Sequence, residues 1–380
     1  MRIALVRDWQ TLQSRQAEWN ALAEQAQTNT IFQTFEWHDS WYQAFGHRYE
    51  LFVLLVEDEA NRLVGIAPLT RVERWFWGHT RRVLELIGTN TSGYCDLIAK
   101  PSDTQSRGMI LGWLADHPAE WDALDWVDIP GTSATTREAQ RFFRKQGFKS
   151  HTRVLYPVAV RALENPTADC ATANSRSVRW QRNRLRRQGE LEFRRLSGFD
   201  EMAPYLDPLF EMHIRRRQVT AMPSLFLDDA YRVFYRTMTK TLAAQGRAVF
   251  YVELLNQTPI ALGICLEHHR RLLLYQFSFD LKYGDFSPGT LLVMDMLGYA
   301  LQSGATEFDL GAGDQPYKYR IAKQTRANMA FRVCQHSTDY YLMRSIVGLK
   351  TLVSRSPRAL ALARRMTEKL KISKQMYQLN

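Results

Sequence analysis

Cysteine is scarce in this sequence, and its placement argues against two kinds of site. The chain has 380 residues and four cysteines, Cys95, Cys170, Cys265 and Cys334. They show neither a CxxC pair nor the Cys/His spacing of a zinc site. The sequence therefore predicts neither a disulfide framework nor a bound metal, and each cysteine is interpreted as a small core residue.

Long apolar runs are also missing. No stretch reaches the roughly 18 uninterrupted apolar residues that a membrane span needs. Residues 1–8 contain a short apolar run interrupted by charge, which predicts a first strand and not a signal peptide. Together these features predict a cytoplasmic protein.

Apolar and basic residues, in contrast, are plentiful. A hydrophobic content of 45% suffices for two packed cores, and the length predicts two domains. The formal net charge is +11, and residues 344–380 contain nine Lys and Arg with a single acid, Glu368. This excess predicts an acidic partner, such as an anionic membrane surface, a phosphorylated substrate or an acidic carrier protein, although a solvated tail would have the same composition.

The second half contains a segment with the order strand, loop, helix, strand. Leu272–Phe279 is rich in β-formers, Ser287-Pro288 opens a helix at Gly289–Gln302, and Thr306–Leu310 forms a second short strand. Because crossovers are right-handed, the two strands are predicted to be parallel and adjacent. Ligands bind beyond the carboxyl ends of such strands, so we expect the site near residues 287–289 and 313–318.

The two halves repeat one order of elements. A hairpin predicted over residues 51–69 has a counterpart over residues 249–266, and strands and helices follow each of them. Internal duplication is the simplest interpretation, with the first half as substrate wall and the second as catalytic unit. We predict a first domain at 1–160, a catalytic domain at 161–340 and a basic helical tail at 341–380.

Two basic segments are candidate anion-binding surfaces. Residues 175–188 place Arg176, Arg179, Arg182 and Arg186 along one side of a predicted helix, where guanidinium groups suit phosphates. The alternative is a solvated helix face paired with scattered acids. The tail combines apolar and basic residues, so it fits either an anionic membrane surface or a packing arm.

A set of motifs in the second half resembles a known family. The set comprises Phe279-Asp280, Ser287-Pro288-Gly289, Gly304, Phe308-Asp309-Leu310, Gly313-Asp314 and Tyr317-Lys318. Their order resembles the BioF2-like, CelD-type branch of the GNAT acyltransferases, which is similar to the FemAB-type transferases with two GNAT-like halves. With weaker matches in the first half, the resemblance covers most of residues 19–335.

The resemblance implies a fold and a donor site. The implied fold is α/β with a mixed sheet, built from two tandem GNAT-like domains and followed by the basic helical segment. The implied donor is an acyl-CoA or an acyl-carrier thioester. The usual coenzyme A loop with its spaced glycines is not present, and this departure from the family pattern argues against coenzyme A itself. The expected donor-binding residues are Gln276, Phe277 and Ser278 on the strand, Ser287, Gly289 and Thr290 at the helix start, and Arg179 and Arg182.

Five residues are candidates for the chemistry. Asp314, Tyr317 and Lys318 form the first cluster, with Tyr317 as the proton donor to the leaving sulfur that the resemblance implies. Their alternative role is a helix start capped by Asp314. His213 is a candidate proton acceptor or a structural helix residue. Asp280 either orients a substrate amine or ends its strand.

The sequence leaves three functional hypotheses. The first is an acyltransferase that uses a thioester to modify an amine or hydroxyl of a cell-envelope or exopolysaccharide precursor, with a small-molecule, lipid or sugar acceptor. The second is a FemAB-like transferase that uses aminoacyl-tRNA, which is the one case that predicts a nucleic-acid partner. The third is a catalytically inactive double-GNAT binding module in an envelope assembly complex.

Overall fold

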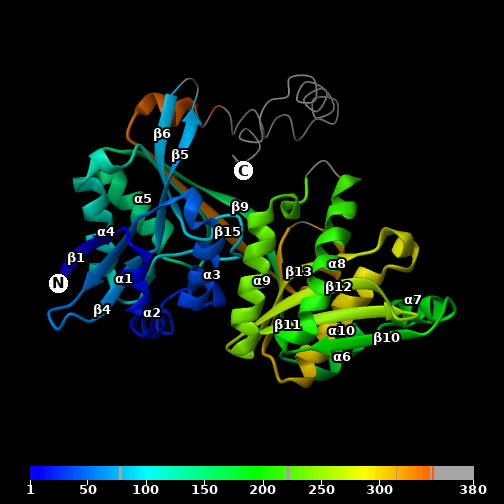
Figure 1. Cartoon of the computed structure of the whole chain (residues 1–380). Coiled ribbons are helices and arrows are strands. Elements are labelled where there is room, and N and C mark those ends of the chain that lie inside the picture. Colours follow the sequence, from blue (N-terminus) through cyan, green and yellow to red (C-terminus); the bar gives the residue numbers. More distant parts are fainter. Residues whose placement is uncertain (77–78, 220–222, 314, 343–344, 346–380) are drawn as a thin grey trace.

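The computed structural model describes residues 1–76, 79–219, 223–313, 315–342 and 345, and Figure 1 shows how its elements are arranged. Helices and strands alternate around a mixed sheet, as predicted. The first half contains β1 (Arg2–Val6), α1 (Trp9–Gln13), α2 (Gln16–Ala23), η1 (Ile31–Gln33), α3 (Phe35–Phe45), η2 (Gly46–Arg48), β2 (Glu50–Leu51), β3 (Val53–Glu57), β4 (Leu63–Ala67), β5 (Leu69–Phe76), β6 (His79–Leu86), β7 (Ile98–Ala99), α4 (Thr104–Asp116), η3 (Pro118–Glu120), β8 (Ala123–Pro130), α5 (Thr135–Lys145) and β9 (Lys149–Ala162).

The second half repeats the alternation with longer helices. Its elements are α6 (Pro166–Ala173), α7 (Arg176–Arg186), β10 (Leu191–Leu196), α8 (Phe199–Gln218), η4 (Leu225–Leu227), α9 (Asp229–Ala244), β11 (Ala248–Leu255), β12 (Thr258–His268), β13 (Arg271–Phe279), η5 (Leu281–Phe286), α10 (Pro288–Gln302), β14 (Glu307–Ala312), α11 (Pro316–Ile321) and β15 (Gln324–Cys334).

One continuous sheet joins the two halves. Its eleven strands follow the order β10-β11-β12-β13-β14-β9-β15-β8-β6-β5-β2, and a separate four-stranded sheet has the order β1-β3-β4-β7. The last strand of each half lies beside strands of the other half, because β9 is inserted between β14 and β15 and β15 is inserted between β8 and β9. β9 crosses the predicted domain boundary at residue 160, and the division into domains stays a prediction.

The predicted crossover in the second half is confirmed. β13 and β14 are parallel neighbours, and α10 connects them with Pro288 in its first turn. The two strands pair only at Arg271–Leu273, after which β13 continues along β12 to Phe279 without β14 at its other edge. The strands therefore diverge beyond Leu273 and leave an opening between them.

Aromatic side chains hold the halves together near this opening. α3 packs against α9, and the ring of Trp37 lies 5.2 Å from that of Phe234 and 5.3 Å from that of Tyr275, edge to face in both cases. These residues belong to one buried cluster that contains side chains from both halves. Such aromatic contacts stabilise beyond the area they bury, so the first half is fixed against the open edge of β13.

Some local predictions were wrong. Strand β9 was not predicted, and neither was helix α6. Cys95, Cys265 and Cys334 are buried as predicted, but Cys170 is exposed. The tail predicted at 341–380 lies outside the described residues except at its first positions. Among the helices that the structure describes, none has both the length and the apolar character required to span a membrane.

Candidate functional site

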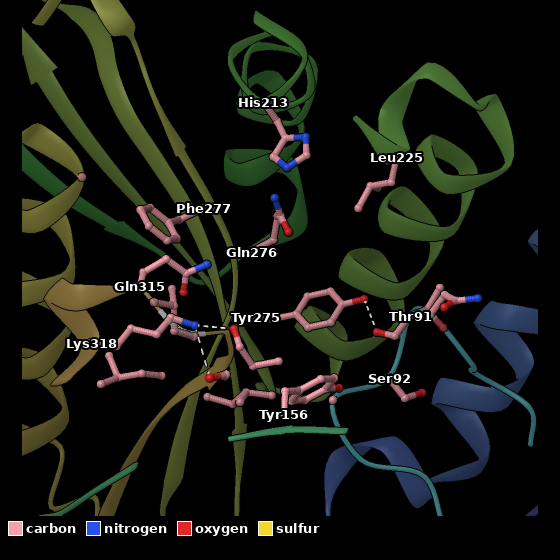
Figure 2. Close-up of a pocket in the computed structure, with 18 of the residues that line it drawn as sticks. Thr91, Ser92, Tyr156, His213, Leu225, Tyr275, Gln276, Phe277, Gln315 and Lys318 are labelled. Atoms are coloured by element: carbon pink, nitrogen blue, oxygen red, sulfur yellow. Dashed lines mark hydrogen bonds between the residues drawn. The ribbon is translucent and has the colours of Figure 1, made fainter. Parts of the chain in front are cut away.

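A cavity of about 950 Å³ lies where the two halves meet. The second half contributes α8, β13, the start of α10, β14 and α11, and the first half contributes residues 90–93 together with parts of β8 and β9. Figure 2 shows side chains from both halves facing the same space. The site thus lies at the predicted carboxyl ends of β13 and β14, and its opposite wall belongs to the first half.

Four strands carry a β-bulge where they border this cavity. The extra residue is Tyr275 in β13, Leu155 in β9 and one of Val127 and Asp128 in β8, and β14 is irregular between Asp309 and Ala312. The bulged residues of β13, β9 and β8 all line the cavity. A bulge bends a strand and redirects its side chains, so these irregularities shape the site.

Tyr275 connects the open edge of β13 to the first half. Its hydroxyl donates to the carbonyl oxygen of Thr91 at 2.9 Å, and its ring stacks on that of Tyr235 at 5.3 Å (Figure 2). Beside it, Gln276 and Phe277 face the cavity. The loop at residues 90–93 is therefore held against the strand that is expected to carry the acyl donor.

Lys318 is buried at the end of β14. Its Nζ donates to the carbonyl oxygens of Gly311 at 3.2 Å and Ala312 at 2.5 Å (Figure 2). Burial lowers the pKa of the ammonium to about 8, while the charge of Asp309 opposes that shift. The side chain therefore binds the last two residues of β14 and remains mostly cationic at neutral pH.

Tyr317 places a phenol in the cavity. Its hydroxyl is buried and has no hydrogen-bond partner among the described residues, and its ring meets that of Phe277 edge to face at 6.0 Å. Burial raises the pKa of this phenol, and Arg216 partly opposes the shift. Tyr317 is therefore a neutral hydroxyl that can donate a proton.

The cavity wall formed by α8 is basic. Arg216 lies over the rings of Phe277 and Phe279, 5.2 and 5.5 Å from their centroids, and forms no ion pair with a carboxylate of the described chain. Arg217 and Arg153 also line the cavity. With Lys318, these cations outnumber Asp128, which is the one carboxylate among the described lining residues, so the site suits an anionic ligand.

His213 points from α8 into the cavity toward Gln276 (Figure 2). Its Nδ1 lies 2.7 Å from the hydroxyl of Ser224, and the ring is almost wholly buried. Burial and the neighbouring Arg216 and Arg217 lower the pKa of the imidazole to about 3. The ring is therefore neutral and a weak base, better suited to hydrogen bonding than to taking a proton.

Asp128 faces the cavity from the first half. It lies at the bulge of β8 with a left-handed φ of 60°, and its carboxylate accepts a hydrogen bond from Tyr156. Burial raises the pKa of the carboxyl group to about 6, although Tyr156 and Asn328 oppose the shift. A non-glycine residue in this conformation is uncommon and concentrates at functional sites. Asp128 is thus a carboxylate that can exchange a proton near neutral pH.

The loop before α10 offers few amides to an anion. The amide of Ser287 donates to Gly284, the amides of Thr290 and Leu291 donate to Ser287, and Pro288 has none. Gly289 is then the amide of this turn best placed for a ligand. A Cβ at Gly289 would lie 2.8 Å from the ring of Phe279, so only glycine fits here. The turn does not provide the row of amides expected to bind a pyrophosphate.

The first half has the corresponding opening, but it is filled. β6 and β8 are parallel and pair only at Val83 and Leu84. Beyond them the chain returns into the gap, where the amide of Cys95 donates to the carbonyl oxygen of Asp128 at 2.9 Å. The neighbouring Asp96 is buried with its oxygens bonded to Thr28 and Thr135. Among the described residues of the first half, the gap between β6 and β8 is therefore occupied by the chain itself, and the role of this half as a substrate wall stays a prediction.

The structure brings most of the predicted residues together. Those lining the cavity are His213, Gln276, Phe277, Ser287, Gly289, Thr290, Tyr317 and Lys318. Asp314 lies outside the described residues.

Four predicted residues do not line the cavity. Ser278 is fully buried, and Asp280 caps η5 by accepting from the amide of Lys282. Arg182 forms an ion pair with Asp295 at 2.5 Å, and Arg179 donates to the carbonyl oxygen of Asn174 at 2.6 Å. The phosphate-binding role expected of these two arginines therefore finds no support inside the cavity.

The sequence prediction missed the residues of the opposite wall. Asp128, Arg153 and Tyr156 belong to the first half, and Arg216 and Tyr275 lie beside residues that were predicted. The run of arginines after His213 was the one local signal that a basic wall follows that histidine. The others depend on contacts between distant strands.

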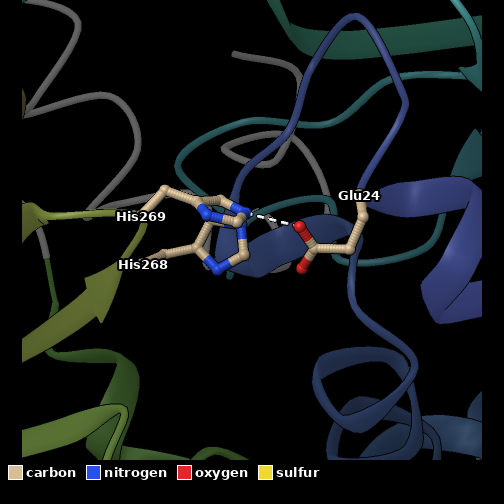
Figure 3. Close-up of side chains that lie close together, drawn as sticks. All are labelled: Glu24, His268 and His269. Atoms are coloured by element: carbon tan, nitrogen blue, oxygen red, sulfur yellow. Dashed lines mark ion pairs between the residues drawn. The ribbon is translucent and has the colours of Figure 1, made fainter.

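A second cluster, Glu24, His268 and His269, brings three potential metal ligands within 4.8 Å of one another (Figure 3). Both ring nitrogens of His268 are already engaged, Nδ1 with Arg247 at 2.6 Å and Nε2 with Asn29 at 2.7 Å. A cation would also have to approach the Arg247 guanidinium, so these residues do not fit a metal. His268 is buried in this contact between the halves.

Comparison with known proteins identifies one domain family and one fold. Residues 173–319 match the acetyltransferase (GNAT) domain family. No curated protein matches the sequence significantly.

Solved structures resemble nearly the whole chain. The crystal structure of FemX is 11% identical, covers 90% of this chain and 99% of its own, and gives a TM-score of 0.60. A conserved protein of unknown function from Bacteroides thetaiotaomicron is 11% identical, with 88% and 100% covered and a TM-score of 0.55. The C-terminal domain of a putative lysylphosphatidylglycerol synthetase from Agrobacterium fabrum is 11% identical, with 91% and 96% covered and a TM-score of 0.50. At this identity the likeness concerns the fold.

Proposed function

On the premise that this chain is an acyltransferase of GNAT fold, with its acetyltransferase domain at residues 173–319, we propose that it transfers an acyl group from a thioester to an amine or hydroxyl. The observation that carries the proposal is the opening between β13 and β14, bordered by Tyr317, Lys318 and Asp128. A bound thioester supplies the acyl carbonyl and a thiolate leaving group.

The open edge of β13 is the proposed donor-binding surface. Beyond Leu273 its backbone groups have no strand on the side of β14, so Leu274–Phe277 can hydrogen-bond an extended arm as a neighbouring strand would. The opening fits such an arm, whereas the turn at Ser287–Thr290 suits the pyrophosphate of coenzyme A less well. The donor is therefore a thioester that is recognised chiefly through its arm.

Tyr317 and Asp128 are the proposed proton donor and acceptor. As the acceptor nitrogen or oxygen bonds to the acyl carbon and the carbon–sulfur bond breaks, Tyr317 gives its proton to the sulfur and Asp128 takes the proton of the acceptor. The raised pKa of Tyr317 keeps its proton available, and an Asp128 pKa of about 6 leaves that carboxylate able to accept one at neutral pH. Lys318 contributes positive charge beside the developing oxyanion.

The proposed acceptor is a cell-envelope or exopolysaccharide precursor that carries an amine or hydroxyl. The CelD-type resemblance motivates this class. The cavity supports it with its volume of about 950 Å³ and with polar side chains such as Asn90, Thr91, Ser92 and Gln315 in its lining. Such groups suit the hydroxyls of a sugar.

A donor carried by tRNA is the alternative, in which the arginines of α7 would bind the phosphates of the tRNA. In that case the protein would bind charged tRNA with an affinity that falls as salt is added, and it would not react with thioesters.

A donor screen tests the proposal. The purified full chain is incubated with acyl-CoA and acyl-carrier thioesters and with amine and sugar acceptors, and the free thiol is measured. We expect acceptor-dependent thiol release that falls about 100-fold or more in Tyr317→Phe. Release that persists unchanged in this variant, or activity with charged tRNA alone, would overturn the assignment.

A further inference from the structure

The exposed face of α7 next to the cavity carries a group of cations that the proposed chemistry does not use. With Val178 and Leu185 buried, the helix turns Arg176, Trp180 and Arg187 outward. Arg179 and Arg184 flank them. We call this surface, together with Lys282 and Leu281 of η5, the α7 face.

The α7 face is connected to the mouth of the cavity. The guanidinium of Arg184 lies between two rings, 4.7 Å from the centroid of Trp180 and 4.9 Å from that of Phe286, and donates to the carbonyl oxygen of Asp285 at 3.1 Å. Phe286 ends η5, and the adjoining Gly284 and Ser287 line the cavity. A macromolecule bound to α7 would therefore sit beside the entrance.

None of the cations of this face reaches into the cavity. No residue of α7 belongs to the lining, and Arg176 and Arg187 form no ion pair within the described part of the chain. The acidic residue of η5 is Asp285, whose backbone carbonyl oxygen accepts the hydrogen bond from Arg184. These cations can therefore bind the anionic surface of a partner that remains outside the cavity while the reactive arm of that partner enters it.

From this arrangement we infer that the α7 face docks an acidic carrier protein, which presents the acyl group as a thioester on a flexible arm. This inference rests on the proposed acyl transfer. Its second support is the turn at Ser287–Thr290, whose amides are mostly taken, so that a nucleotide pyrophosphate is held poorly there. A carrier-bound thioester has no need for that contact.

The composition of the face fits a protein better than a nucleic acid. The side chains of Trp180 and Leu281 are 57% and 42% exposed among the cations. Tryptophan and arginine are enriched at protein interfaces, where an apolar centre is surrounded by charge. An acidic partner surface complements the cations and is attracted over several ångströms before contact.

The test compares one acyl group on two carriers. Acyl transfer is measured with an acidic acyl carrier protein and with coenzyme A as the donor, for the full chain and for the double variant Arg176→Glu/Arg187→Glu. The matched control reverses two exposed arginines of α5, Arg137→Glu/Arg144→Glu, at the other end of the molecule (Figure 1).

We expect kcat/KM for the carrier-bound donor to fall about tenfold or more in the α7 variant and to fall with added salt in the wild type, because surface charges steer association. The α5 control and all rates with coenzyme A stay unchanged. Three results would overturn the docking. The α7 variant could lose the same activity with both donors, it could use the carrier-bound donor as well as the wild type does, or it could lose retention of charged tRNA while still using the carrier-bound donor.

The two proposals fail in different ways. The docking surface is refuted, and the acyl transfer is not, if two results occur together. The α7 variant keeps its activity with the coenzyme A thioester, and the wild-type protein shows no preference for the carrier-bound donor. Absence of reaction with either thioester refutes the acyl transfer and, with it, the docking.

Discussion

Asp128 is the residue whose replacement separates stability from activity most clearly. The change Asp128→Asn keeps a side chain that tolerates a left-handed φ and accepts a hydrogen bond from Tyr156. It removes the charge that burial disfavours. The expected outcome is a more stable protein at neutral pH that transfers acyl groups poorly.

The magnitude follows from the pKa of Asp128. Burial raises it from its ordinary value of 3.8 to about 6, so the folded chain binds more protons than the unfolded chain between these two pH values. The contribution of Asp128 to the free energy of unfolding is therefore fully present below pH 3.8. It is lost as the pH rises from 3.8 through 6. At about 1.4 kcal/mol per pH unit, the loss is about 3 kcal/mol above pH 6.

Urea denaturation of both proteins at pH 4.5 and pH 8 measures the effect. The stability of Asp128→Asn relative to wild type should be higher at pH 8 than at pH 4.5 by about 2 kcal/mol, because about 1 of the 3 kcal/mol is already lost at pH 4.5. Comparing the two pH values removes any effect of the substitution on packing. The rate of acyl transfer by the wild type should increase with pH, with the midpoint of the increase near pH 6. The variant should be slower by about 100-fold or more and should lack this increase. A variant as stable as wild type at both pH values, with the rise in rate intact, would refute the role of Asp128.

Three further changes test other parts of the site. Tyr317→Phe should leave the melting temperature unchanged, because its hydroxyl has no hydrogen-bond partner among the described residues, while thiol release falls; a drop in melting temperature would argue for a structural role. Gly289→Ala should cost about 1–3 kcal/mol in denaturant unfolding, because the new Cβ would lie 2.8 Å from the Phe279 ring, and an unchanged midpoint would contradict this packing. Tyr275→Phe should cost about 1–3 kcal/mol by leaving the buried Thr91 carbonyl oxygen without its donor and should raise the KM for the acceptor, whereas unaltered KM and stability would show that the contact between the halves does not matter.

The second half could be predicted from the sequence because its signals are local. A run of β-formers, a turn with Pro288 at the helix start and a short second strand lie within forty residues, and right-handed crossovers then determine the pairing of β13 with β14. The GNAT part of the resemblance, drawn from the same segment, is confirmed by the domain match at residues 173–319, and the structure of FemX shares the fold. Tyr317 and Lys318 reach the cavity for the same reason.

The opposite wall could not be predicted because it depends on pairing between distant segments. β9 contains Pro157, which argues against a strand inside a sheet, yet it pairs from Lys149 to Val160 with β15, more than 150 residues away. The bulge that turns Asp128 into the cavity is a register shift between β8 and β15, and no local pattern encodes it. Arg182 was likewise assigned to phosphate because its partner, Asp295, lies on a helix far along the chain.

The central claim is that the acyl donor lies along the open edge of β13. A crystal structure of the full chain with a non-hydrolysable thioester analogue tests it most directly. The account predicts the arm of the analogue beside Leu274–Phe277, with its acyl carbonyl near Tyr317 and Lys318 and facing Asp128. An analogue bound elsewhere, with the opening between β13 and β14 closed, would contradict it.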